Sequence, residues 1–589
     1  MKRIRKTKII CTLGPSCEKP EVLEELLKAG MNIARLNFAH GSHDYHKLLV
    51  NNLRQASHKT KIPVAILADI KGPEIRTGAV AENKTILLKK DEEVVVTSED
   101  VPTRPGLISL NYKNLASEIT PGKHLRISDG LIDLEVLRIE RGAIICVVRN
   151  GGELGSHKNV NIVGLKTNLP ALTEKDIRDI MWSIENGVDF IAASFIRRPE
   201  NVREIRSLIE VADAQIDIIA KIEDREGVDN IDEIIRVSDG IMVARGDLGV
   251  QLPAAEIPLV QKRIIAKCNA SNKPVITSTQ MLESMIRNPI PTRAEVTDIA
   301  NAIFDGTDCI MLSGETASGL YPVEAVRIMH QVALETENSP EFRQRQESRY
   351  ELEAKSNIAD SVAKAAYLIA HEIGAQSILT PSLHGNTPRL VSRFRPAQTI
   401  IAVTPSPIIQ RRLLIFWGVV PLIAKLTSDS DVMIENAIAQ AVETTLIKDF
   451  DRVVILAGLP VDSPIMLNTI RVHLHCRVLA KSQRGYGGRI SGRVVKVKSA
   501  EEALNRIRGT GDEILVTSYL SPDFTPVLSK IAGYILEKFS FMGFQEIERY
   551  HKEIVALAGT REALTILEDG AMITIDGQEK LIYSGKPAR

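Results

Sequence analysis

The chain has 589 residues, of which 25% are charged, and its 74 basic and 74 acidic side chains give a formal net charge of zero. A chain of this length is too long for one hydrophobic core and predicts several domains. The balanced charge excludes a global attraction to nucleic acid or to an anionic membrane, so we expect neither as a partner.

The sequence also predicts no targeting or membrane segment. No apolar run approaches the ~20 residues that a membrane span needs. The basic start, Met1 to Lys8, leads into Ile9-Ile10-Cys11 without the apolar stretch of a secretory signal. The six cysteines are scattered without metal-type pairing. We interpret them as reduced, buried thiols of a cytoplasmic protein.

Eight short apolar runs, each typical of a parallel strand covered on both faces, recur in residues 1–76 and 169–345. They are Ile9–Leu13, Asn32–Phe38, Val64–Ile70, Phe190–Phe195, Asp217–Glu223, Gly240–Ala244, Val275–Thr279 and Cys309–Leu312. Between most of them lie amphipathic helical stretches, for example Glu18–Ala29, Asp44–Ser57, Glu174–Asn186, Pro199–Val211, Gly227–Val237, Ala255–Ala270 and Ala294–Phe304. Two helix starts, at Thr292 and Thr173, carry capping boxes. Eight strand-then-helix units predict an α/β fold, the (β/α)8 TIM barrel.

One connection in this barrel departs from the strand-then-helix pattern. Between Thr77 and roughly Leu169 the helical pattern gives way to short alternating strands punctuated by Pro and Gly. Because this stretch is too long for a loop, we predict a small β-barrel domain, residues 77–168, inserted after the third strand. An insertion at this point would lie over the mouth of the barrel and could act as a lid.

A second α/β pattern covers residues 346–476. Strands at Ser377–Thr380, Thr399–Val403, Val419–Ile423 and Arg452–Leu456 and helices at Ile358–Glu372 and Asp431–Lys448 predict an open, doubly wound domain. The glycine-rich segment Ala480 to Arg489 reads as a linker. A last β/α domain of the swivelling type is expected at 490–589, with strands near Ile514–Val516, Ile554–Ala558 and Met572–Ile575.

The chemistry is expected where the barrel strands end, because active sites of this fold lie at the C-terminal strand ends. The residues at these ends are Arg35, Asn37, Asp69, Lys71, Lys221, Glu223, Gly246, Asp247, Thr279, Ser313 and Glu315. Glu223 and Asp247 offer hard oxygen ligands to a divalent metal, and Lys221 adds a point charge beside them. Each acid alone is more often half of a barrel salt bridge. Together, they predict a site for phosphoryl or enolate chemistry.

Gly246 and Thr279 extend this site. Without a side chain, Gly246 lets its own and the next backbone N–H approach an anion such as the carboxylate of a small keto or enol acid. Thr279 could place a hydroxyl near the reacting carbon, although a threonine at a strand end is usually explained by β-propensity alone.

Seven strings of this chain, in the same order, resemble pyruvate kinase. They are Thr7–Pro15, Asn32–Gly41, Lys71–Gly78, Ala220–Glu223, Met242–Gly249, Thr277–Met281 and Met311–Ala317. The resemblance implies transfer of the phosphoryl group of phosphoenolpyruvate to ADP, which gives ATP and pyruvate in the last step of glycolysis. A family member is also expected to be a cytoplasmic homotetramer.

The resemblance implies a role for each matching residue. Glu223 and Asp247 match the carboxylates that hold Mg²⁺ or Mn²⁺, and Lys221 matches the lysine that stabilises the phosphoryl group. The amides of Gly246 and Asp247 match the cradle of the substrate carboxylate, with Thr279 in the protonation machinery. Arg35 matches the arginine that reaches the phosphoryl group, and Arg76 matches a contact for the nucleotide phosphates.

The resemblance also implies a K⁺ site, and here the chain departs from the family pattern. Asn37 and Asp69 match two ligands, and Ile70 stands where a backbone carbonyl serves as a third. Ala39 replaces the serine that completes the set, and a methyl group cannot bind a cation. Glu74 matches the form associated with K⁺ dependence. We therefore expect K⁺ binding that is weaker than in the family.

The two later domains also resemble the family. The loop of Thr380, Ser382, Gly385, Asn386 and Thr387 resembles the site of a phosphorylated allosteric effector, although an ordinary turn before a helix would look the same. The last domain resembles the extra C-terminal domain of some bacterial pyruvate kinases, which is similar to the mobile domain of phosphoenolpyruvate-using enzymes. Ser540 to Glu546 lacks the phosphohistidine motif, and His551 reads as a surface residue.

Two other functions stay open at this point. A catalytically inactive metabolite-sensing paralogue would bind a divalent metal and form no pyruvate. A metal-dependent keto-acid lyase would act through a metal enolate and would need no ADP.

Overall fold

The computed structural model describes residues 4–81, 84–165, 168–347, 357–425, 427, 429–458, 467–538 and 554–587. These residues form two compact units, one made of 1–367, 380–433 and 457–468 and the other of 368–379, 434–456 and 469–589. The segment Ser540 to Glu546 and His551 lie outside the described residues.

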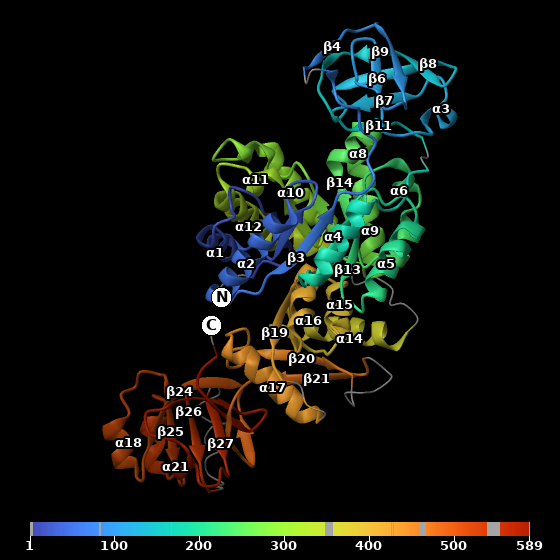
Figure 1. Cartoon of the computed structure of the whole chain (residues 1–589). Coiled ribbons are helices and arrows are strands. Elements are labelled where there is room, and N and C mark those ends of the chain that lie inside the picture. Colours follow the sequence, from blue (N-terminus) through green and yellow to red (C-terminus); the bar gives the residue numbers. More distant parts are fainter. Residues whose placement is uncertain are drawn as a thin grey trace. The chain divides into compact units, whose positions relative to one another are not determined.

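The predicted barrel is confirmed as eight parallel strands in a closed sheet (Figure 1). The strands, in their order around the barrel, are β1 (Lys8–Thr12), β16 (Cys309–Leu312), β15 (Val275–Ser278), β14 (Gly240–Ala244), β13 (Asp217–Ile222), β12 (Phe190–Ala193), β3 (Ala65–Ile70) and β2 (Ile33–Asn37). Nearly every residue of these strands is buried, as expected for strands with a packed interior and a helical coat.

Helices cover the outside of the barrel or follow directly on the ends of its strands. They are α1 (Pro20–Ala29), α2 (His43–Thr60), α4 (Glu174–Glu185), α5 (Pro199–Val211), α6 (Arg225–Asp229), α7 (Ile231–Val237), α8 (Arg245–Gln251), α9 (Ile257–Ser271), α10 (Arg293–Asp305), α11 (Gly314–Ala317), α12 (Pro322–Asn338) and α13 (Pro340–Glu347). Both predicted capping boxes form: the Thr292 and Thr173 hydroxyls accept from the third amide of α10 and α4. The helix expected over 227–237 is interrupted at Asn230, where α6 ends.

The inserted domain has the expected β fold. Its strands β11 (Val160–Ile162), β7 (His124–Ile127), β8 (Ile132–Glu140), β9 (Ala143–Asn150), β5 (Glu93–Thr97) and β6 (Leu107–Ser109) form a six-stranded sheet in that order. A second sheet pairs β10 (Gly152–Leu154) with β4 (Ile86–Leu88), and the short helix α3 spans Leu115–Glu118. The domain has a hydrophobic cluster of its own.

The next α/β pattern is confirmed as a five-stranded sheet. Its order is β19 (Val419–Ile423), β18 (Thr399–Thr404), β17 (Ser377–Pro381), β20 (Arg452–Ala457) and β21 (Thr469–Leu474), the last strand having escaped the sequence analysis. The helices are α14 (Ile358–Glu372), α15 (Asn386–Ser392), α16 (Pro407–Arg412) and α17 (Ser430–Glu443).

The last part of the chain forms an eight-stranded mixed sheet. Its order is β22 (Val478–Lys481), β29 (Leu581–Ser584), β28 (Met572–Asp576), β24 (Arg489–Lys496), β25 (Glu513–Thr517), β26 (Gly533–Leu536), β27 (Val555–Ala558) and β23 (Arg484–Tyr486), with helices α18 (Ala500–Arg506), α19 (Thr525–Leu528) and α21 (Ala563–Ile566).

The linker predicted from Ala480 to Arg489 is therefore wrong, because this segment lies in β22, β23 and the start of β24. Gly485 and Gly487 of this segment allow close backbone approach. A Cβ on Gly485 would lie 2.1 Å from the carbonyl oxygen of Gly577.

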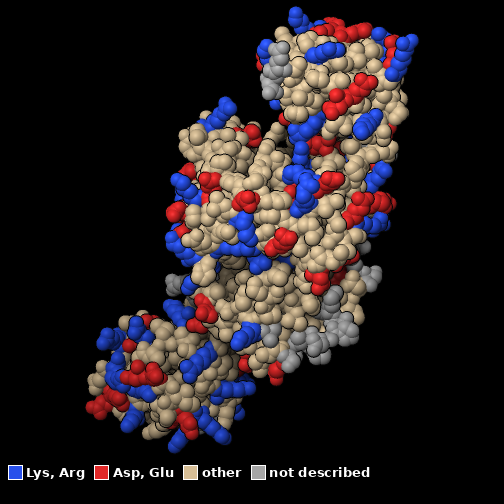
Figure 2. Space-filling model, viewed as in Figure 1, with Lys and Arg blue, Asp and Glu red and all other residues tan. Residues whose placement is uncertain are grey.

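Two further observations concern the helices and the surface. Among the described residues, no helix combines the length and apolar character that a membrane crossing demands. Acidic and basic side chains are interspersed over the face seen in Figure 2.

Candidate active site

The C-terminal ends of β3, β12 and β13 bring a buried ammonium group into a ring of oxygen atoms. Lys221 Nζ lies 3.1 Å from Asp69 Oδ1, 2.7 Å from Ser194 Oγ and 3.0 Å from Glu223 Oε1. The second oxygen of Glu223 accepts the backbone N–H of Phe195 at 2.6 Å. The predicted residues Asp69, Lys221 and Glu223 thus meet, as expected for neighbouring strands of a barrel.

Arg35 joins this cluster from β2. Its Nε donates to Asp69 Oδ2 at 2.7 Å, and its Nη1 donates to the Thr12 hydroxyl at 2.9 Å. Thr12 in turn donates to the carbonyl of Leu312 at 2.8 Å. The guanidinium is 8% exposed and is therefore fixed in orientation by its partners.

The charges of this cluster stabilise one another. Burial alone would lower the pKa of Lys221, but the carboxylates of Asp69 and Glu223 raise it above its ordinary value. Burial would likewise raise the pKa of Asp69, but Lys221 and Arg35 lower it. The lysine is therefore a permanent cation at neutral pH, which suits electrostatic stabilisation of a transferring anion.

Asp247, the third residue of α8, is in a different electrostatic state. Burial and the neighbouring charge of Glu223 raise its pKa to about 7. Its carboxylate makes no hydrogen bond or ion pair within the described part of the chain. The charge of Glu223, at the end of the neighbouring strand, therefore acts on Asp247.

The donor set fits a divalent cation. Two carboxylates that repel each other are stabilised when a hard cation lies between them, and Mg²⁺ usually takes only one or two carboxylates, with water and substrate oxygens completing its shell. Across the described residues, no group of three or more His, Cys, Asp or Glu side chains forms a closed protein cage. A cation held by two carboxylates alone would have its remaining positions filled by water and substrate.

Gly246 and Thr279 also come together, but in an arrangement that the sequence did not predict. The Gly246 N–H donates to Thr279 Oγ1 at 2.8 Å, and that hydroxyl donates to the carbonyl of Ser278 at 2.6 Å. Thr279 has a φ of 67°, in the left-handed region that a β-branched residue rarely adopts. Backbone strain of this kind is often found at functional sites.

A further arginine stabilises this strained turn. Arg245, the first residue of α8, donates to the Thr279 carbonyl at 2.6 Å and to the Ser278 carbonyl at 3.2 Å. Its Nη1 lies 2.6 Å from Asp298 Oδ2. Arg245 thus joins the start of α8 to the end of β15.

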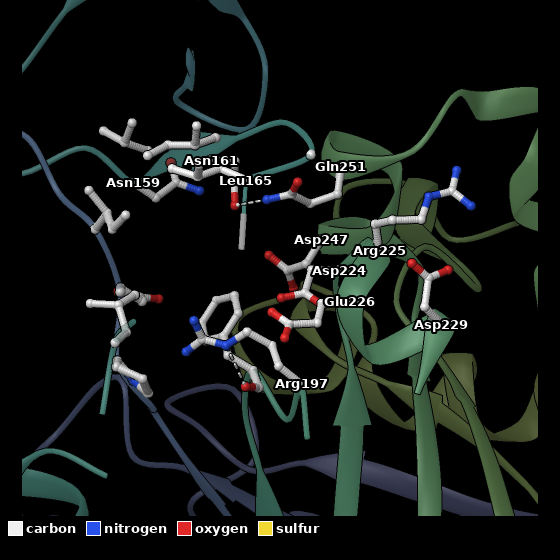
Figure 3. A pocket seen from close by; sticks show the side chains of 18 residues that line it. Asn159, Asn161, Leu165, Arg197, Asp224, Arg225, Glu226, Asp229, Asp247 and Gln251 are labelled. Carbon is white, nitrogen blue, oxygen red and sulfur yellow. Dashed lines mark hydrogen bonds between the residues drawn. The ribbon is translucent and has the colours of Figure 1, made fainter. Parts of the chain in front are cut away.

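A cavity of about 220 Å³ opens beside Asp247 (Figure 3). Barrel residues such as Phe195, Arg197 and Asp224 line one side, and residues of the inserted domain line the other. Gln251 Nε2 donates to Asn161 Oδ1 across this boundary at 3.1 Å. The inserted domain therefore contributes to the walls of the site, as expected for a lid.

Arg76 lies near this cavity and is held by an acid. Its Nη2 lies 2.6 Å from Glu74 Oε2, and its Nη1 donates to the carbonyl of His157 at 2.8 Å. Lys71 Nζ lies 3.3 Å from the same oxygen of Glu74. The side chain of Arg76 is 35% exposed, so it remains accessible to an anion.

The three residues assigned to K⁺ lie at the ends of β2 and β3. Asn37 Oδ1 accepts from the backbone N–H of Ala39 at 3.1 Å, and the Ile70 carbonyl accepts from Ser194 Oγ at 2.8 Å. Asp69 is occupied by Arg35 and Lys221. The side chain of Ala39 offers no oxygen here.

The residues predicted to take an effector lie at the end of β17 and in the loop and helix after it. Thr380 Oγ1 donates to the Ile401 carbonyl at 3.2 Å, and Ser382 Oγ accepts from the Gly385 N–H at 2.9 Å. Gly385 has a φ of 77°, which favours glycine. Asn386 and Thr387 begin α15, and Thr387 is buried.

Sequence reasoning missed several residues of the site: Thr12, Ser194, Arg245 and the amide of Phe195. Thr12 ends β1 and Ser194 directly follows β12, the two strands whose ends the sequence analysis did not search, so the same rule would have found both. Arg245 precedes a predicted site glycine, but nothing in its local pattern indicates that it reaches the next strand.

The fold and the site define a (β/α)8-barrel enzyme with an inserted β domain and a charged, open metal-type site at the C-terminal strand ends. Family models for the pyruvate kinase barrel domain, the pyruvate kinase alpha/beta domain and the mobile domain of PEP-utilising enzymes match residues 4–326, 360–473 and 509–580.

Relatives match along the whole chain. The pyruvate kinase of Geobacillus stearothermophilus is 46% identical over 585 residues and that of Sporosarcina psychrophila 43% over 586, with 99% of both chains covered in each case. A crystal structure of a pyruvate kinase from Cryptosporidium parvum superposes with a TM-score of 0.76 at 40% identity, covering 80% of this chain and 96% of that one. The chain belongs to the pyruvate kinase family, and it is a metal-dependent phosphotransferase with the extra C-terminal domain.

Proposed function

We propose that the chain transfers the phosphoryl group of phosphoenolpyruvate to ADP at the cluster around Lys221. The observation that carries this proposal is a buried ammonium group held by Asp69, Ser194 and Glu223 next to the unmatched carboxylate of Asp247. Phosphoryl transfer depends on positioning and charge neutralisation more than on covalent chemistry, and such a cluster supplies both.

Glu223 and Asp247 would hold Mg²⁺ or Mn²⁺. The bound cation supplies charge neutralisation and orients the transferring oxygens. The raised pKa of Asp247 supports this role, because two carboxylates that repel each other are stabilised most when a cation binds between them. Asn37, Asp69 and the Ile70 carbonyl are proposed for K⁺, which Ala39 leaves with one oxygen fewer.

The remaining residues would bind and orient the substrates. Arg35 and Lys221 would contact the phosphoryl group from its buried side, and Arg76 would contact the nucleotide phosphates. The amides of Gly246 and Asp247 would receive the substrate carboxylate. Since the Gly246 N–H donates to Thr279 Oγ1 in the free chain, this hydroxyl would turn toward the reacting carbon when the carboxylate arrives.

The rest of the chain would regulate and assemble this site. We propose a barrel of residues 1–76 and 169–345, a lid of 77–168 and a regulatory domain of 346–476. The extra domain, expected at 490–589, would also include β22 and β23, which belong to its sheet. The loop of Thr380, Ser382, Gly385, Asn386 and Thr387 would take a phosphorylated effector. A cytoplasmic homotetramer is the assembly that we expect.

A coupled assay for pyruvate tests this function. Purified chain should form pyruvate from phosphoenolpyruvate only when ADP and a divalent cation are both present, and more rapidly with K⁺ than with a large inert cation. Pyruvate formation without ADP would indicate a lyase instead. Tight Mn²⁺ binding without any pyruvate would indicate an inactive sensor.

A further inference from the structure

A short helix that is far from the active site forms ion pairs with acids at the starts of two barrel strands. The adjacent residues Arg411 and Arg412 end α16, which follows β18 in the α/β pattern after the barrel. Arg411 Nε lies 2.8 Å from Asp189 Oδ1, and Arg412 makes a two-pronged contact with Asp217, with Nε at 2.8 Å from Oδ2. All these residues belong to one compact unit. Figure 1 shows α16 next to the barrel, at the end opposite α8.

Both aspartates lie at the starts of strands that carry the active-site cluster: Asp217 begins β13, and Asp189 directly precedes β12. Asp217 is the first residue of β13, and Lys221 lies four residues further along the same strand, roughly 13 Å away. The other oxygen of Asp189 accepts the Ile66 N–H of β3 at 2.9 Å, and β3 ends with Asp69 and Ile70. The side chains of Asp189 and Asp217 are only 1% and 10% exposed, so their positions depend on these partners.

The same helix is packed against the effector loop. A Cβ on Gly385 would lie 3.2 Å from both Ile409 Cγ2 of α16 and Leu413 Cδ2 just beyond it. A change of the loop backbone therefore presses on α16. Because packed interfaces transmit strain and do not absorb it, such a change reaches the two arginines.

We propose that Arg411 and Arg412 are positioning residues that fix where β3 and β13 lie along the barrel axis and how they are inclined to it. Through these two strands they couple the loop at Ser382–Gly385 to Lys221, Glu223 and Asp69. The inference rests on the roles proposed for Lys221 and Glu223. Steady-state kinetics of Lys221→Met test those roles without any change in α16, so a failure there is distinguishable from a failure here.

A matched control is available at the next strand. Arg206 of α5 lies 2.6 Å from Asp239 Oδ2, and that oxygen also accepts the Ile218 N–H of β13 at 2.8 Å. This pair has the same chemistry at the same end of the barrel and a similar burial. It comes from a barrel helix and holds the same strand, β13, at Ile218, whereas Arg412 holds it from α16 at Asp217.

The experiment compares full-length Arg412→Met and Arg206→Met. We expect Arg412→Met to weaken Mn²⁺ binding, measured by electron paramagnetic resonance without substrate, and to raise the half-saturating phosphoenolpyruvate concentration. Both shifts should be about 3- to 10-fold, the range for coupling through a packed network. Arg206→Met should lower the melting temperature by a similar amount and leave both constants unchanged. Equal shifts in the two variants would show a merely structural role and overturn the proposal.

A double-mutant cycle tests the connection to the loop. Gly385→Ala adds a methyl group against Ile409 and Leu413 and should shift the half-saturating phosphoenolpyruvate concentration in the wild-type background. In the Arg411→Met/Arg412→Met background, this shift should disappear. Equal effects in both backgrounds, including no effect in either, would overturn the coupling.

A conservative variant guards against loss of folding. Arg412→Lys keeps the positive charge but cannot make the two-pronged contact with Asp217. It should shift Mn²⁺ affinity in the same direction as Arg412→Met and by less. An unchanged affinity in Arg412→Lys, together with an unchanged half-saturating concentration, would also overturn the proposal.

Discussion

The two ends of the barrel use the same charged residues in opposite ways. At the N-terminal end, a repeated pattern of Arg–Asp pairs occurs at strand starts: Arg411–Asp189, Arg412–Asp217, Arg206–Asp239 and Arg395–Asp308. In the pairs of Asp189 and Asp308 the second aspartate oxygen accepts an amide at the start of a neighbouring strand, and in the pair of Asp239 the same oxygen accepts both the arginine and such an amide. Each of these acids has an arginine partner within the protein.

At the C-terminal end, the acids are not all matched. Asp69 and Glu223 share Lys221, whereas Asp247 keeps a pKa of about 7 because burial and Glu223 disfavour its charge. A buried charge that the protein leaves unmatched is a place for a ligand, and matched pairs are structural. The comparison separates binding chemistry from scaffold without reference to any relative.

The largest effect is expected at the C-terminal end. Lys221→Met should lower the turnover number by ~10³-fold, because it removes the fixed cation from the developing charge of the transferring phosphoryl group. Steady-state kinetics measure this, with Lys28→Met, whose side chain is 53% exposed, as the control for loss of a lysine. An unaffected turnover number would remove Lys221 from the reaction and weaken the contrast between the two ends.

The next effect belongs to the N-terminal end. Arg395→Met should lower the free energy of unfolding by about 3–5 kcal/mol, since it leaves the carboxylate of Asp308 buried without its partner. The two side chains are 3% and 4% exposed, with Nη1 2.6 Å from Oδ1.

Urea unfolding of the full chain provides the measurement. Arg203→Met breaks an exposed pair with Glu200, whose side chains are 59% and 61% exposed, and should change little. Similar losses in both variants would show that burial does not set the value of these pairs.

A pH experiment extends the comparison to Lys8, a buried cation whose hydrogen-bond acceptor is a carbonyl oxygen and not a carboxylate. Lys8 Nζ donates to the Val419 carbonyl at 2.6 Å, and burial lowers its pKa from 10.5 to about 8. Between pH 8 and 10.5 the unfolded chain binds more protons than the folded chain, so the contribution of Lys8 to stability rises with pH. Across this range the stability of the wild type relative to Lys8→Met should increase by about 3 kcal/mol.

Thermal and urea unfolding at pH 7 and pH 10 would measure this increase. Lys28→Met serves as the control for the loss of one positive charge. A stability difference between wild type and Lys8→Met that stays constant or falls with pH would contradict the lowered pKa.

The smallest effect concerns the K⁺ site. Ala39→Ser restores a hydroxyl that can contact a cation and should lower the half-activating K⁺ concentration by about twofold to tenfold, the value of one polar contact. Activity is titrated with K⁺ at constant ionic strength, with tetramethylammonium as the balancing ion. No change in the half-activating concentration would show that residue 39 does not face the cation.

Local sequence patterns were enough to predict much of the fold of this protein. The eight barrel strands were predicted from their apolar runs, because strands covered on both faces have a composition unlike the amphipathic helices between them. The site residues followed from one geometric rule, since every parallel strand of a barrel delivers its C-terminal end to the same face. The capping boxes at Thr173 and Thr292 needed only four consecutive residues each.

Only the tertiary structure could show which charged side chains have an ion-pair or hydrogen-bond partner. Arg411 and Asp189 are separated by 222 residues, and no local spacing indicates that they meet. The same holds for the segment from Ala480 to Arg489, whose glycines read as a flexible linker until their sheet partners are known. Periodicity and strand ends are short-range properties that the sequence determines directly. The pairing of buried charges depends on long-range packing, because each partner lies on an element whose position is set by the rest of the fold.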